Sequence, residues 1–106
     1  MNIFLDQQDV VDSVHVYIAS QDNHGRVEGS APQNVHEVQI SFDERYGFSA
    51  SGVLYGRQHR LNQQEVIDAV SVYLSSYYSF RADCLLVKMN WDESSQSFSA
   101  DVIVER

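Results

Sequence analysis

The side chains best suited to binding a metal are four histidines and one cysteine. They are His15, His24, His36, His59 and Cys84. None of them stands in an H-E-x-x-H, C-x-x-C or H-x-H spacing, which would direct two ligands at one ion. We therefore expect partly exposed histidines, no metal site and no cofactor.

Two pairs of adjacent acids, Asp43-Glu44 and Asp92-Glu93, are the candidates for acid–base chemistry. Two carboxylates can act as acid and base where burial separates their pKa values. Both pairs lie in polar predicted turns, so we expect solvated, turn-forming residues. A weak cation site is the alternative, although a calcium loop needs more oxygen ligands at defined spacing.

No residue forms a recognisable nucleophilic centre. The chain has no G-x-S-x-G elbow, and Gly52 and Gly56 do not form a phosphate-binding loop. Cys84 precedes Leu85 and Leu86, which favours a thiol buried in the core over a catalytic one. The only cysteine cannot form an internal disulfide, and it suits a reducing cytoplasm. These residues favour a protein that is not an enzyme.

Two tyrosines and two arginines are candidates for binding a small ligand. Tyr17 and Tyr73 occupy equivalent positions in two similar segments, and we expect them to pack in the core with their hydroxyls at its rim. The alternative is a groove between the two segments. Arg57, His59 and Arg60 form the densest basic group, which is either a solvated loop or an anion-binding segment.

The net charge of −8 excludes several classes of partner. An acidic protein repels phosphate backbones, so we expect no nucleic acid. No signal-peptide pattern opens the sequence, and no apolar run approaches the ~20 residues of a membrane span. We therefore expect a cytoplasmic protein that does not bind the membrane.

The segments 5–20 and 61–76 have similar sequences, with nine of sixteen aligned positions identical. Further matches follow in the same order: residues 42–44 with 91–93, and 48–50 with 98–100. Chance similarity rarely keeps its order over separate blocks. We interpret the chain as an internal duplication, a single domain over residues 1–106 made of repeats at about 5–56 and 61–106.

Each repeat begins with a predicted helix. Asp6 and Asn62 are suitable N-caps, because a short side-chain oxygen can accept from free amides of the first turn. Asn62 with Glu65 resembles a capping box. Apolar residues then recur at helical spacing. They are Val10, Val11, Val14, Tyr17 and Ile18 in the first segment, and Val66, Ile67, Val70, Tyr73, Leu74, Tyr77 and Tyr78 in the second.

Each helix is followed by a predicted hairpin. Residues 38–42 alternate apolar and polar, which is typical of a half-buried strand, and residues 48–54 return after a turn that contains Gly47. Residues 85–91 and 98–104 repeat this pattern.

Two connections complete the chain: a long polar surface loop at 20–35 and a linker between the repeats at 56–60. The predicted product is an α+β fold of order α-β-β-α-β-β. We expect a four-stranded, mostly antiparallel sheet with both helices on one face, and an approximate two-fold axis between the repeats.

The outward positions of the predicted sheet include four apolar side chains: Val53, Tyr55, Leu86 and Ile103. Isolated exposed apolar residues are common, but a cluster of them would mark an interaction face. We favour a non-enzymatic binding or assembly module, with a homodimer or another protein as the partner. The alternative is a small-ligand-binding protein, or a small enzyme, with a groove between the repeats at Tyr17, Tyr73, Arg57 and Arg60.

The segments Leu61–Val70 and Tyr46–Ala50 resemble the YxcD-like family of small uncharacterised proteins from Bacillus and related Firmicutes. The resemblance covers nearly the whole chain, including the doubled helix–hairpin order. The long loop at residues 20–35 departs from the family pattern. Because the family has no assigned activity, the resemblance implies no functional residues.

Overall fold

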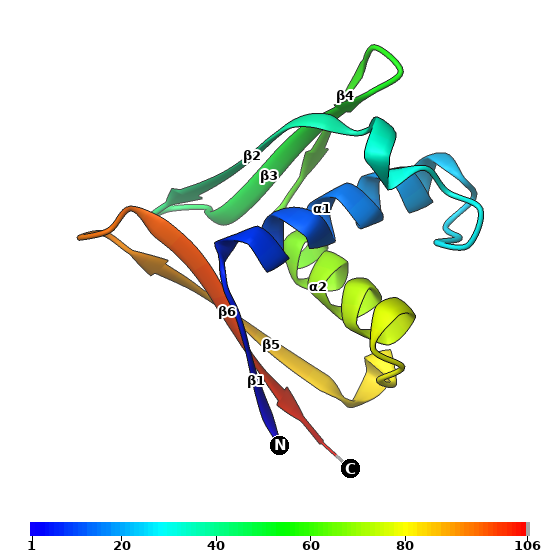
Figure 1. Cartoon of the computed structure of the whole chain (residues 1–106). Helices are drawn as coiled ribbons and strands as arrows, with labels where there is room; N and C mark the ends of the chain where they lie inside the picture. The colour runs from blue at the N-terminus through cyan, green and yellow to red at the C-terminus, as the bar shows by residue number, and fades with distance from the viewer. Residues whose placement is uncertain (106) are drawn as a thin grey trace.

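The computed structural model describes residues 1–105, which form an α+β fold with two helices and six strands (Figure 1). The first half holds β1 (Asn2–Leu5), α1 (Gln7–Asp22), a 3-10 turn η1 (Pro32–Asn34), β2 (His36–Asp43) and β3 (Gly47–Leu54). The second half holds β4 (Arg57–Leu61), α2 (Gln63–Tyr77), η2 (Ala82–Cys84), β5 (Leu85–Asp92) and β6 (Ser97–Val104). The same order of elements therefore occurs twice. The duplicated origin and the two-fold axis stay predictions, and Arg106, the end of the predicted second repeat, lies outside the described residues.

Both helices begin where the sequence predicted them. The Asp6 carboxylate accepts from the Asp9 amide at 2.9 Å, and the Asp9 carboxylate accepts from the Asp6 amide at 3.2 Å. Asn62 and Glu65 exchange the same pair of hydrogen bonds at 2.9 and 3.1 Å. Each helix thus starts with a complete capping box, which satisfies two free amides of its first turn.

The predicted four-stranded sheet with both helices on one face is wrong. The strands form two three-stranded antiparallel sheets, in the orders β1-β6-β5 and β2-β3-β4. The difference comes from β1 and β4, of four and five residues, which precede the helices. β4 has the sequence Arg-Gln-His-Arg-Leu, whose lack of apolar alternation led us to expect a linker.

Each sheet contains strands from both halves of the chain. β1 pairs with β6 of the second half, with Leu5 opposite Ala100, and β4 pairs with β3 of the first half, with Leu61 opposite Ala50. Figure 1 shows the two sheets opening from one edge with α1 and α2 between them. Each helix contacts strands of both sheets as well as the other helix. Neither sheet is complete without both halves.

Half of the twelve helix residues predicted to face the core are fully buried there, and Tyr17, Ile67 and Tyr73 pack against it while partly exposed. The fully buried side chains include Val10, Val14 and Ile18 of α1 and Val66, Val70 and Leu74 of α2. They pack in one cluster with buried strand residues such as Ala50, Leu54, Ala100 and Val102. Tyr77 and Tyr78, which the helical period assigned to the same face, are instead exposed because α2 ends at Tyr77.

The two sheets meet at the tips of the hairpins, where four aromatic rings pack together. Phe42 lies 4.8 Å from Phe48 and 6.4 Å from Trp91 between ring centroids, and Phe98 lies 4.6 Å from Trp91 and 6.1 Å from Phe48. The four rings therefore form a closed cluster that draws two rings from each sheet.

The first residue of each helix fixes a return strand of the other half. The side-chain oxygen of Gln63 accepts from the Phe48 amide at 3.0 Å, and that of Gln7 accepts from the Phe98 amide at 2.9 Å. Gly47 has a φ of +77°, and a Cβ on it would overlap the Gln63 amide. Glycine is thus required here both by the backbone conformation and by the close approach.

Replacing Val70 by Asp should reduce the free energy of unfolding by about 3–5 kcal/mol, because an unpaired charge would lie in the core. Val70→Ala, which only leaves a cavity, should cost about 2 kcal/mol. Urea denaturation followed by circular dichroism measures both changes. Wild-type stability of the Asp variant would show that the core face of α2 is assigned incorrectly.

Candidate functional site

The four residues of the predicted interaction face are divided between the two sheets. Leu86 on β5 and Ile103 on β6 are register partners, and they are 55% and 45% exposed. Val53 lies on β3 of the other sheet, and Tyr55 lies in the turn that follows it. The structure therefore brings Leu86 and Ile103 together but separates them from Val53 and Tyr55.

Phe4 joins Leu86 and Ile103 on the outer face of the β1-β6-β5 sheet. It is 66% exposed, and it pairs with Asp101, two residues before Ile103, so Phe4 lies diagonally next to Ile103. We call Phe4, Leu86 and Ile103 the apolar face. Phe4 was not expected on this face because β1 was not predicted. Phe4 lies between Ile3 and Leu5, whose side chains point to the opposite, buried face of the strand.

The outer face of the other sheet is polar. Arg60 on β4 is the register partner of Ser51, and it lies beside Gln39 and Gln58. Arg57 begins the same strand and is exposed. The two arginines of the predicted ligand groove therefore lie on the sheet and are not joined with Tyr17 and Tyr73 in one groove.

The four strands at the sheet edges differ in how well they are protected from further pairing. β1 and β4 are short, and β2 has a register irregularity between His36 and Gln39, with Glu37 at a φ of +55°. β5 pairs with β6 over eight residues without interruption. Short length, bulges and charges are the devices that protect edges. β5 is the long edge strand without a bulge.

The hydrogen bonds of β5 show which of its backbone groups face the open edge. The Glu105 amide donates to the Cys84 carbonyl at 2.7 Å, so this pair faces β6. The backbone groups of successive residues in a strand point alternately to opposite sides, so the amides and carbonyls of Leu86 and Lys88 also point towards β6. The amides and carbonyls of Val87 and Met89 therefore point away from β6, towards the open edge.

A groove of about 340 Å³ lies between α1, η1 and α2, and we call it the interhelix groove. Its lining residues are Asp12, His15 and Val16 of α1, Pro32 and Gln33 of η1, and Tyr73 and Tyr77 of α2. Tyr73 was a predicted groove residue. Tyr17 does not line this groove. The groove is bounded by helix residues from both halves and by the 3-10 turn that ends the long 20–35 connection.

The two tyrosines predicted for the ligand groove face acidic residues of the opposite helix. Burial raises the pKa of Tyr73 to about 12, assisted by its interaction with Tyr78 and by the charges of Asp12 and Asp9 on α1. Burial also raises the pKa of Tyr17, together with the charges of Asp68 and Glu65 on α2. Each phenol therefore lies near carboxylates of the opposite helix.

The remaining candidate groups include the histidines. No group of three or more His, Cys, Asp or Glu side chains in this part of the chain could hold a metal ion. His15 Nδ1 lies 3.4 Å from the Pro32 carbonyl oxygen, and His59 Nε2 is buried without a hydrogen-bond partner. His59 faces the core side of β4, away from the interhelix groove.

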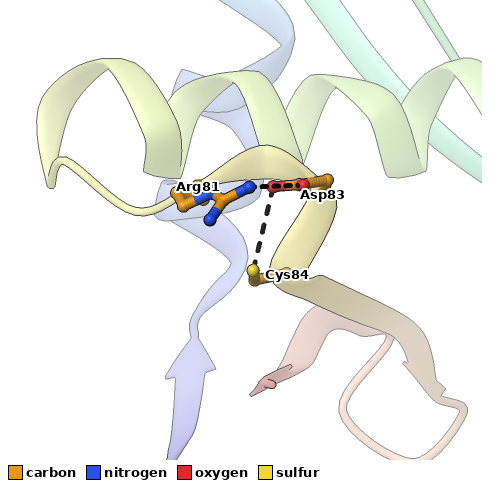
Figure 2. Close-up of polar contacts among 3 residues, drawn as sticks. All are labelled: Arg81, Asp83 and Cys84. Atoms are coloured by element: carbon orange, nitrogen blue, oxygen red, sulfur yellow. Dashed lines mark hydrogen bonds and ion pairs between the residues drawn. The ribbon is translucent and has the colours of Figure 1, made fainter. Parts of the chain in front are cut away.

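Cys84 is half-buried at the end of η2, not enclosed in the core as predicted (Figure 2). Its Sγ lies 3.7 Å from Asp83 Oδ1, and Arg81 forms an exposed ion pair of 2.9 Å with the same carboxylate. The predicted core position was wrong because the thiol precedes β5 and does not belong to it. Exposed pairs of this kind contribute little stability.

Three of the paired acids, Asp43, Glu44 and Glu93, line a hollow of about 470 Å³ between the hairpin tips, together with Phe42, Arg45 and Trp91. The Asp43 carboxylate accepts from the Arg45 and Tyr46 amides, and Asp92 accepts from the Ser94 amide and hydroxyl. The hydrogen bonds from Ser94 and Ser95 lower the pKa of Asp92. Asp43 and Asp92 thus act in the turns as expected.

The raised pKa of Tyr73 predicts that the protein loses stability at high pH. The phenol ionises near its ordinary value of about 10 in the unfolded chain but only near 12 in the folded protein. The free energy of unfolding should therefore fall as pH rises from about 10 towards about 12. Urea denaturation across this range measures the slope. Tyr73→Phe should make the decline shallower, and an unchanged slope would contradict the assignment.

No helix within residues 1–105 combines the length and the hydrophobicity of a membrane-crossing segment. No solved structure matches the chain. The chain is 29% identical over 105 residues to the uncharacterized protein YxcD of Bacillus subtilis (strain 168), and the alignment covers 98% of this chain and 95% of that protein. The predicted resemblance is thus confirmed. Residues 1–94 match the model of the family described as protein of unknown function (DUF2653), and the chain belongs to that family.

Proposed function

We propose that this protein is a binding module that assembles with a second copy of itself through β5 and the apolar face. The observation that supports the proposal is the position of three large exposed apolar side chains, Phe4, Leu86 and Ile103, beside an open eight-residue edge strand. The family is described as one of unknown function, so the support comes from the structure alone.

Leu86 supplies a reason to associate, because it is the residue of the apolar face that lies on the edge strand itself. Removal of its apolar surface from water favours a complex. Single exposed apolar residues are ordinary, but here Leu86 and Ile103 are cross-strand neighbours and Phe4 lies on the diagonal. The polar outer face of the β2-β3-β4 sheet offers no comparable cluster among the described residues, which makes the β1-β6-β5 sheet the better candidate.

The open edge determines the geometry of the partner. The outward amides and carbonyls of Val87 and Met89 can pair with another strand. A second β5 related by a two-fold axis would run antiparallel to the first and use the same groups, as a self-complementary interface requires. The product is a six-stranded sheet in which both apolar faces lie on one side and Leu86 of each copy borders the joint.

The partner is a second copy because the edge strand has no net charge and therefore does not repel another β5. Within β5, Lys88 and Asp92 are the only charged residues, and they have opposite signs. A chain with a net charge of −8 repels its own copy over most of its surface. We expect weak association, since one pair of strands with one apolar side chain from each copy buries less than the ~1,600 Å² of a standard interface.

Sedimentation equilibrium over increasing concentration should show the wild-type mass rising from monomer to dimer. Leu86→Glu should stay monomeric, because it places a charge beside the joint between the two β5 strands. Val53→Glu makes the same change on the outer face of the other sheet and should dimerise like the wild type. A wild type that stays monomeric at millimolar concentration would reject the proposal, as would dimerisation of Leu86→Glu.

Hydrogen exchange tests the edge itself. At dimer-forming concentration the amides of Val87 and Met89 should exchange more slowly than in dilute protein, because they gain partners. The amides of β2, the corresponding edge of the other sheet, should not change. Concentration-independent exchange at Val87 and Met89 in a dimer would show that the copies meet elsewhere.

A further inference from the structure

We propose that the interhelix groove binds a small organic cation that carries an aromatic ring. This inference is independent of self-assembly, because the groove lies between the helices and the apolar face lies on the outside of a sheet. It combines three properties of the groove: aromatic walls, the Asp12 carboxylate and no Lys or Arg among its lining residues. The lining also holds His15, whose Nδ1 lies 3.4 Å from the Pro32 carbonyl oxygen.

The aromatic walls come from α2 and are supported by aliphatic groups of α1 and η1. The ring centroids of Tyr73 and Tyr77 are 5.4 Å apart, with 41° between their planes. Val16 and Pro32 complete the apolar surface. A volume of about 340 Å³ lies at the lower end of the ~300–1,000 Å³ typical of small-ligand sites, so a ligand with a single ring fits best.

Asp12 supplies the charge. Its Oδ1 accepts from the Gln8 side-chain amide at 2.9 Å, which leaves Oδ2 free of hydrogen bonds from the described residues. The one ion pair within residues 1–105 joins Arg81 and Asp83, so no Lys or Arg of this part of the chain neutralises Asp12. An ammonium group can pair with this carboxylate while its ring lies against the tyrosines, whose faces attract cations.

The electrostatic environment favours a cation over an anion. Burial raises the pKa of the Tyr73 phenol, and the charges of Asp12 and Asp9 on α1 add to this effect. The raised pKa keeps the Tyr73 phenol neutral at neutral pH, and its oxygen can accept a hydrogen bond from the ammonium group of the ligand. The net charge of −8 further raises the local concentration of cations.

The opposite end of the helix pair lacks this combination. There Asp68 accepts from Gln64 at 3.0 Å, as Asp12 does from Gln8, and Tyr17 faces it. However, the position that corresponds to Tyr77 is Gln21, so the second aromatic wall is missing at that end. Asp68 is therefore a matched control with the same side chain and the same internal hydrogen bond.

The test is a titration of isotope-labelled protein with phenethylammonium, followed by amide chemical shifts. We expect saturable shifts at the lining residues with dissociation in the high micromolar to millimolar range. Phenylacetate, which has the ring but the opposite charge, and ethylammonium, which has the charge but no ring, should each bind at least about tenfold more weakly. Absence of saturable shifts with phenethylammonium, or equal binding of phenylacetate, would overturn the proposal.

Variants separate a specific site from general attraction by an acidic protein. Asp12→Asn should weaken phenethylammonium binding at least about tenfold, whereas Asp68→Asn should bind like the wild type. Tyr77→Ala should also weaken binding, and it leaves the core intact because Tyr77 is 54% exposed. Equal losses in the two Asp variants, or wild-type binding by Asp12→Asn, would show that the groove is not the site.

Discussion

The exchange of strands between the two halves is the constraint on which the structure depends. β1 finds its partner in β6, and β4 finds its partner in β3, so each half completes the sheet of the other. The helices reinforce this exchange, because Gln7 and Gln63 each accept a hydrogen bond from the hairpin of the opposite half. A half alone would leave strand edges unpaired and the apolar faces of its helix uncovered. We expect the two halves to fold and unfold together.

The same exchange determines where the candidate sites lie. By adding β1 to the second-half hairpin, it brings Phe4 beside Ile103 and creates the apolar face. By crossing α1 against α2, it sets Tyr73 opposite Asp12 and Tyr17 opposite Asp68. The halves then differ in detail: η1 and Tyr77 complete a groove at one end, and only one sheet has an apolar outer face. Binding is proposed at the places where the two halves differ.

Local signals predicted much of the fold, because each depends on neighbouring residues. The caps at Asp6 and Asn62, the helical spacing of Val66 and Val70, and the alternation that predicted the hairpins all correspond to the structure. The arrangement of the strands in two sheets could not be predicted from local signals. β4 has only five residues, and most of them are exposed and polar. Its pairing with β3 depends on tertiary contacts, so its own sequence shows no apolar alternation that would predict a strand. The prediction of the apolar face was incomplete for the same reason, because without β1 nothing placed Phe4 beside Leu86 and Ile103.

Native-state hydrogen exchange at the buried amides of α1 and α2 tests most directly whether the two halves, each of which supplies a strand to the sheet of the other, depend on each other for stability. If the halves depend on each other, the amides of Val14 and Val70 open with the same free energy and the same dependence on denaturant, equal to those of global unfolding. Opening free energies that differ by more than about 1 kcal/mol, with the halves losing protection separately, would contradict the account.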